Sequence, residues 1–160
     1  MNRRQGLVAL AALMSTAAAL PTGWATSPRR PLVEVWKDPH CGCCQDWVDH
    51  MQAHGFAVTI HATGNNAVRA RLGLPQKLGS CHTALVGGYA VEGHVPASDV
   101  RKLLQQKPKA LGLAVPGMPV GSPGMDGPAY GDRRDPYDVL LVARDGSTRV
   151  FKSYNKKAST

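Results

Sequence analysis

Hydrophobic positions along the chain alternate in some segments and recur every three to four residues in others. Alternation over β-branched and aromatic residues predicts strands, and recurrence at i, i+3 and i+4 predicts helices. Strands are predicted at 32–36, 56–61, 83–86, 89–94, 137–143 and 148–154, and helices at 44–54, 65–72 and 99–106. The first seven of these elements follow the order β-α-β-α-β-β-α, and a β-hairpin closes the chain.

Turn and cap residues support these boundaries. Gly87-Gly88 and Asp145-Gly146 each separate two predicted strands, as in tight hairpins. Asn65 or Asn66 is placed to cap the second helix, and Ser98 the third. Two early strands joined by a helix favour parallel pairing, and the hairpins add antiparallel strands. The pattern predicts an α/β fold: a thioredoxin-like mixed sheet flanked by helices, with a C-terminal β-hairpin.

The segment 111–135 differs in composition from the rest of the chain. It contains Pro116-Gly117-Met118-Pro119 and then Pro123-Gly124-Met125-Asp126. So many glycines and prolines argue against regular structure. We therefore predict a long Gly/Pro/Met loop, and loops of this length in a compact domain are usually functional or disordered.

The first 25 residues have the pattern of an export signal. A basic start, Met1 to Arg4, precedes an apolar run over 7–20 and the small-x-small sequence Gly23-Trp24-Ala25. The run is shorter than the roughly 20 residues that span a bilayer, although an uncleaved anchor is the alternative. We expect a signal peptide at 1–25, a linker at 26–31, one domain at 32–154 and a polar tail at 155–160. The expected location is the periplasm, with no stable membrane insertion after cleavage.

Composition and charge narrow the classes of partner. The chain has 160 residues, 43% of them hydrophobic and 19% charged, which suits a single folded domain. Its formal net charge is +8, but the basic residues are scattered and lack interleaved aromatics. A nucleic-acid interface needs a concentrated basic face. We therefore expect no nucleic-acid partner.

Four cysteines carry the candidate chemistry. Cys41, Cys43 and Cys44 lie between a predicted strand and a predicted helix, and a helix N-terminus stabilises thiolate. Cys81 precedes the third strand, at a turn that faces the C-x-x-C helix in thioredoxin-like folds. That turn usually carries a cis-proline, and His82 stands in its place. The fold would thus gather four sulfurs and at least one imidazole around one point.

Such a cluster suits a soft metal ion. Cu(I) prefers thiolate and thioether donors, and Zn(II) also accepts four thiolates. Adjacent Cys43 and Cys44 tend to point apart, so thiolates that bridge several copper ions fit better than one tetrahedral site. The loop methionines could add thioether sulfur. The candidate metal ligands are Cys41, Cys43, Cys44, Cys81, His82, Met118 and Met125.

Two other interpretations of the cysteines stay open. Structural disulfides, Cys41–Cys44 with Cys43–Cys81, would give a stapled interaction module, although a four-residue loop gains little from closure. A thiol-disulfide oxidoreductase would use Cys41 as the attacking thiol and Cys44 as the resolving thiol. The missing proline argues against this second interpretation. Of the other histidines, His40 is a minor candidate for a ligand or pKa modulator, and surface positions are expected for His50, His54, His61 and His94.

Three segments in this order resemble the CopG-type copper-resistance proteins. They are Cys41-Gly42-Cys43-Cys44, Cys81-His82-Thr83, and residues 112–119 with 121–125. The resemblance covers 32–154 and implies an exported thioredoxin-like protein that binds a polynuclear Cu(I) cluster through the four cysteines. It also implies a role in copper resistance and a redox role with Cu(I) and Cu(II), without deciding whether there is enzymatic turnover. The expected partners are copper ions and periplasmic copper-efflux or copper-transfer proteins.

Overall fold

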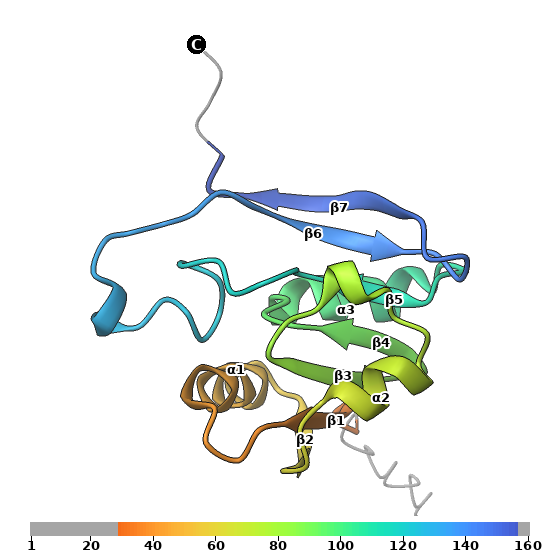
Figure 1. The fold of residues 1–160 in the computed structure, drawn as a ribbon, viewed down its shortest axis with the longest axis horizontal. Coiled ribbons are helices and arrows are strands. Elements are labelled where there is room, and N and C mark those ends of the chain that lie inside the picture. Colours follow the sequence, from red (N-terminus) through yellow and green to blue (C-terminus); the bar gives the residue numbers. More distant parts are fainter. Residues whose placement is uncertain (1–28, 157–160) are drawn as a thin grey trace, which may run out of the picture.

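The computed structural model describes residues 29–156, which form one mixed sheet with helices on both faces (Figure 1). The predicted signal peptide and residues 157–160 lie outside the described residues. The elements are β1 (Leu32–Lys37), α1 (Gly42–Ala53), β2 (Ala57–His61), α2 (Asn66–Arg71), β3 (His82–Val86), β4 (Tyr89–Glu92), α3 (Ala97–Gln106), β5 (Gly112–Ala114), β6 (Tyr137–Val142) and β7 (Thr148–Tyr154). Short 3-10 turns occupy Gln76–Leu78 and Pro128–Tyr130. Within 29–156, no helix has the length and apolar character needed to cross a membrane.

The seven strands have the order β2-β1-β3-β4-β5-β6-β7. β1 pairs parallel with β2 and antiparallel with β3, where Lys37 lies opposite His82. β4 pairs antiparallel with β3 and parallel with β5, and β6 and β7 continue the sheet antiparallel. The predicted α/β fold with a mixed sheet and a C-terminal β-hairpin is confirmed.

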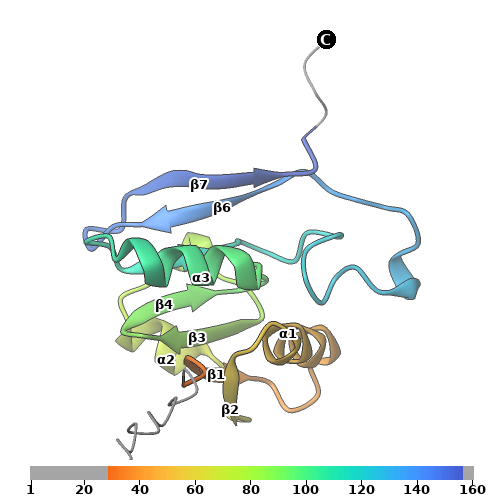
Figure 2. The same cartoon turned by 180° about the vertical axis from the view of Figure 1, so that it is seen from behind.

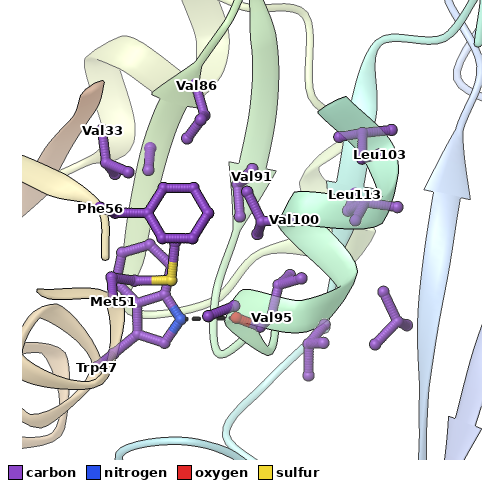
Figure 3. Close-up of a cluster of buried hydrophobic side chains, with 14 of the residues drawn as sticks. Val33, Trp47, Met51, Phe56, Val86, Val91, Val95, Val100, Leu103 and Leu113 are labelled. Carbon is purple, nitrogen blue, oxygen red and sulfur yellow. Dashed lines mark hydrogen bonds between the residues drawn. The ribbon is translucent and has the colours of Figure 1, made fainter. Parts of the chain in front are cut away.

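The main core lies between the sheet and two of the helices. α1 and α3 pack on one face and α2 on the other, as the views from the two sides show (Figures 1 and 2). Trp47 and Met51 of α1 and Leu103 of α3 are fully buried there. The Trp47 indole N–H donates a 2.9 Å hydrogen bond to the Val95 carbonyl (Figure 3). This bond joins α1 to the segment that leads into α3. It also satisfies a buried donor inside an apolar cluster.

The helix starts differ from the predicted ones. α1 begins at Gly42, with Cys41 at the N-cap, so Cys43 and Cys44 both lie in its first turn. Ser98 does not cap α3, because the helix begins at Ala97 after Pro96. The Ala97 N–H, which a capping side chain could have satisfied, instead donates to His50 Nε2 at 3.1 Å.

The prediction that 111–135 lacks regular structure is wrong for two short pieces. β5 lies within this segment, as does the 3-10 turn at Pro128–Tyr130. A Cβ on Gly112 would overlap the backbone of Ala90, so glycine allows β5 to approach β4 closely. β5 thereby joins the β6–β7 hairpin to the rest of the sheet.

Gly112→Ala is expected to destabilise the protein by about 2 kcal/mol or more, because β4 and β5 must separate to admit a methyl group. Urea unfolding measures the change. Gly127→Ala serves as the matched control, since a Cβ there would meet no atom within 4 Å. Equal unfolding midpoints for the two variants would contradict the close approach.

Candidate metal centre

The β1–α1 loop and the turn before β3 meet at one end of the sheet. Because β1 ends at Lys37 opposite His82, the loop that carries Cys41 leaves the sheet beside the turn that carries Cys81. One sulfur atom from each of Cys41, Cys43, Cys44 and Cys81 lies within 4.8 Å of the others. The predicted gathering of the four sulfurs is therefore present.

Two of the four cysteines are joined to each other. Cys41 and Cys44 form a disulfide, and Cys43 and Cys81 are free thiols. The Cys43 sulfur lies 3.6 Å from that of Cys41 and 3.9 Å from that of Cys81. Among the described residues, one of the two disulfides considered from the sequence is thus formed and the other is not. Cys43 and Cys44 do not point apart as expected for adjacent residues, because both sulfurs lie against Cys41 and Cys81.

Two buried imidazoles complete the cluster. The Cys81 sulfur lies 3.1 Å from His94 Nε2 and 3.5 Å from His82 Nδ1. Cys81, His82 and His94 form a second group whose ligand atoms all lie within 4.8 Å of one another. His82 therefore lies where it was predicted, beside the cysteines. The prediction that His94 is a surface residue is wrong, because its side chain is fully buried.

Hydrogen bonding fixes the tautomer of His94 and leaves one ring nitrogen of His82 without a partner. His94 Nδ1 lies 2.8 Å from the Pro123 carbonyl, which can only accept, so Nδ1 carries the proton and Nε2 faces Cys81 with its lone pair when the ring is neutral. His82 packs against Trp47, with ring centroids 4.4 Å apart. Its Nε2 is buried and has no hydrogen-bond partner within residues 29–156. A buried ring with one unpartnered nitrogen, whose other nitrogen lies 3.5 Å from the Cys81 sulfur, fits a metal-binding site.

Burial also sets the protonation of these groups. Desolvation lowers the pKa of His82, with His94 as a further cause, and desolvation lowers the pKa of His94. Both rings are therefore held neutral, which is the form that binds metals. Burial, together with the neighbouring Cys43, raises the pKa of Cys81 to about 12. A metal ion that binds Cys81 must consequently displace its proton.

The Gly/Pro/Met loop packs against both parts of the cluster. Gly124 lies so close to α1 that a Cβ there would come 2.6 Å from the Cys43 carbonyl oxygen. On the other side, the Ser80 hydroxyl donates to the Gly117 carbonyl at 2.5 Å. Met125 is buried, and its sulfur accepts a 3.3 Å hydrogen bond from the Tyr130 hydroxyl. Met118 is 51% exposed. Thioether ligation by either methionine stays a prediction.

The remaining histidines of the described segment lie outside both sulfur and imidazole groups. His40 and His54 are exposed, and His61 stacks on Trp36 with ring centroids 4.6 Å apart. His50 is half-buried rather than solvated, because it accepts the Ala97 N–H between α1 and α3.

The hairpin register could have placed His94 beside Cys81, but it could not have shown that the ring is buried. The Gly87-Gly88 turn sets Thr83 opposite Glu92, and two further residues along this register Cys81 faces His94. What the pattern lacked was the covering segment, since Pro123 comes from a distant loop. A histidine at a strand end without such a cover is ordinarily a surface residue.

Comparisons with known proteins identify one family model and two solved structures that are similar to the chain. A family model described as "Protein of unknown function, DUF411" matches residues 78–125. Two solved structures are similar to the chain, "Copper resistance protein copG- Form 1" at 48% identity and "Copper resistance protein copG- Form 2" at 47%. They cover 77% and 78% of this chain and 96% and 98% of their own, each with a TM-score of 0.71. No curated protein matches the chain.

The disulfide assignment predicts how many thiols react. The air-exposed, metal-free protein should bind two equivalents of a thiol-alkylating reagent after denaturation, at Cys43 and Cys81, and four after prior reduction. Peptide mass spectrometry identifies the modified residues. Alkylation of Cys41 or Cys44 without reduction would contradict the pairing.

Proposed function

The chain belongs to the family of CopG copper resistance proteins, and from this premise we propose that it binds Cu(I) as a thiolate cluster. The observation that carries the proposal is the convergence of four sulfurs, all within 4.8 Å of one another, at one end of the sheet. Thiolates are soft ligands, and Cu(I) is a soft ion that favours them. Copper is the cargo of this site.

The proposed ligands are the cysteines Cys41, Cys43, Cys44 and Cys81, with the imidazoles of His82 and His94 beside them. Met118 and Met125 are proposed as additional thioether donors from the loop. Four sulfurs and two imidazoles exceed what a single Cu(I) ion needs. Cys43 lies between Cys41 and Cys81, at 3.6 and 3.9 Å from their sulfurs, which suits thiolates that bridge more than one copper ion.

Loading the full site requires the Cys41–Cys44 disulfide to open. A reductant must supply two electrons and two protons to convert the disulfide into two thiols, which then lose protons as copper binds. We propose that this step makes copper binding depend on the thiol redox state. The protein would buffer Cu(I), pass it to efflux or transfer proteins, or cycle it between Cu(I) and Cu(II). The export pattern of residues 1–25 supports the periplasm as the location.

An anaerobic Cu(I) titration against a competing chromophoric chelator tests the proposal. The reduced protein is expected to withdraw more than one copper ion per chain from the chelator and to develop copper–thiolate absorbance. The protein with its Cys41–Cys44 disulfide intact should bind fewer ions, because two sulfurs are then unable to act as thiolates. A reduced protein that cannot compete with the chelator would overturn the proposal.

Single substitutions test the ligand set. Cys81→Ser should abolish cluster formation, because Cys81 is the sulfur that both imidazoles approach. His94→Ala should weaken Cu(I) binding about tenfold or more, in the range for loss of an orienting group at a metal site. His54→Ala is the matched control, since His54 is an exposed histidine of α1. Unchanged copper stoichiometry in Cys81→Ser would exclude the four-cysteine site.

A second candidate function follows from the disulfide itself. Cys41 at the N-cap of α1, bonded to Cys44, has the arrangement of a thiol-disulfide oxidoreductase. Residues 29–156 contain no cis peptide bond, and His82 stands where such enzymes usually have cis-proline. Catalytic reduction of insulin by the protein, lost in Cys41→Ser, would favour this function over copper handling.

A further inference from the structure

A buried ion pair lies behind the cysteine cluster, on the α2 face of the sheet. Arg69 of α2 and Glu92 of β4 approach to 2.8 Å, with side chains 7% and 0% exposed. Such a pair loses so much hydration that a hydrophobic replacement is often equally stable. A contribution to the free energy of unfolding is therefore a weak explanation for this buried pair. The contacts of the two side chains indicate another role.

Both charged side chains bind the backbone of Ser80, the residue that precedes Cys81. The Ser80 N–H donates to Glu92 Oε1 at 2.7 Å, and the Ser80 carbonyl accepts from Arg69 Nη2 at 2.5 Å. Ser80 and Cys81 lie outside any strand, since β3 begins at His82. The two charged side chains thus satisfy the backbone N–H and carbonyl of Ser80, which a neighbouring strand would satisfy inside a sheet.

Glu92 also binds Thr83, the residue that follows Cys81 and His82. The Thr83 hydroxyl donates to Glu92 Oε2 at 2.5 Å, and Asn65 Nδ2 donates to the Thr83 hydroxyl at 3.1 Å. Asn65 also donates to the Ser80 carbonyl at 3.2 Å. Cys81 and His82 are therefore bracketed by two residues that both bind Glu92.

Glycine at position 79 makes room for this arrangement. A Cβ at Gly79 would lie 3.2 Å from Arg69 Nη1 and 3.3 Å from its Cζ, so the guanidinium packs directly against the turn. The planar guanidinium meets Glu92 and the Ser80 carbonyl with separate N–H groups, which an ammonium on a flexible stem cannot match in geometry.

We propose that Arg69 and Glu92 are positioning residues that hold Cys81 within reach of Cys43 and His94. They contact none of the sulfurs and act through the Ser80 and Thr83 groups on either side. The inference rests on the proposed copper site for its functional meaning. Its geometric content, the placement of the Cys81 sulfur 3.9 Å from that of Cys43, can be measured without copper.

Disulfide trapping measures the placement directly. In a Cys41→Ala, Cys44→Ala background only Cys43 and Cys81 remain, and diamide oxidises the two thiols to a disulfide while its N=N bond takes up the two electrons and two protons. We expect Arg69→Lys and Glu92→Gln to slow this closure about tenfold. Arg71→Lys, an exposed arginine of the same helix, should close at the parent rate.

Cu(I) affinity in the otherwise unaltered chain provides the second measurement. Arg69→Lys and Glu92→Gln should weaken it by roughly 10- to 100-fold, as loss of outer-shell partners does at metal sites. Slower closure in a protein whose parent chain binds no Cu(I) would support the positioning role and overturn the copper function alone.

A second, less disruptive pair of variants separates the positioning effect from loss of the folded state. Thr83→Val removes the hydroxyl bound to Glu92 Oε2, and Thr83→Ser keeps it. We expect Thr83→Val to slow Cys43–Cys81 closure and Thr83→Ser to restore it, with urea midpoints confirming that each variant is folded. Folded Arg69→Lys, Glu92→Gln and Thr83→Val variants that close at the parent rate would overturn the inference.

Discussion

The register between β1 and β3, in which Lys37 lies opposite His82, is the constraint on which the site depends. It places the exit of β1 and the entry of β3 at the same end of the sheet, so Cys41 and Cys81 become neighbours although 40 positions apart in the sequence. The register also decides which face each residue of β3 occupies. His82 faces Trp47 of α1, whereas Thr83 faces Glu92 and α2. A slip of one residue would exchange these faces and remove His82 from the cluster.

Much of the fold could be predicted because its signals are local. The Gly-Gly turn, the alternation in β1 and the apolar face of α1 are each contained within a dozen residues. β5 could not be found in this way, because three residues show no periodicity and its pairing depends on the missing Cβ of Gly112 against Ala90. The start of α3 also escaped prediction. The group that satisfies its first N–H is His50, a side chain from α1.

In the candidate site, too, the features with local sequence signals could be predicted and those that depend on distant segments could not. The clustering of four cysteines could be predicted, because three of them adjoin one strand and the fourth precedes the neighbouring strand. His94 could not be distinguished from a surface histidine, since its burial depends on a loop about thirty residues away, through the Pro123 carbonyl. The network of Arg69 and Glu92 was equally hidden. A basic residue on a short helix and an acidic residue at a strand end are usually solvated, and only the sheet brings them together.

At the proposed metal site, the Cys41–Cys44 disulfide couples metal binding to thiol reduction in one thermodynamic cycle. An ion that binds the reduced thiols and not the disulfide stabilises the reduced form by its own binding free energy. The reduction potential of the pair must then rise with free metal concentration. Because the couple transfers two electrons, the rise is about 30 mV for each tenfold by which bound metal shifts the equilibrium toward the reduced form. The same chain would therefore resist oxidation when metal is abundant and close its disulfide when metal is scarce. In an oxidising compartment, such coupling would let the metal itself protect the thiols that hold it.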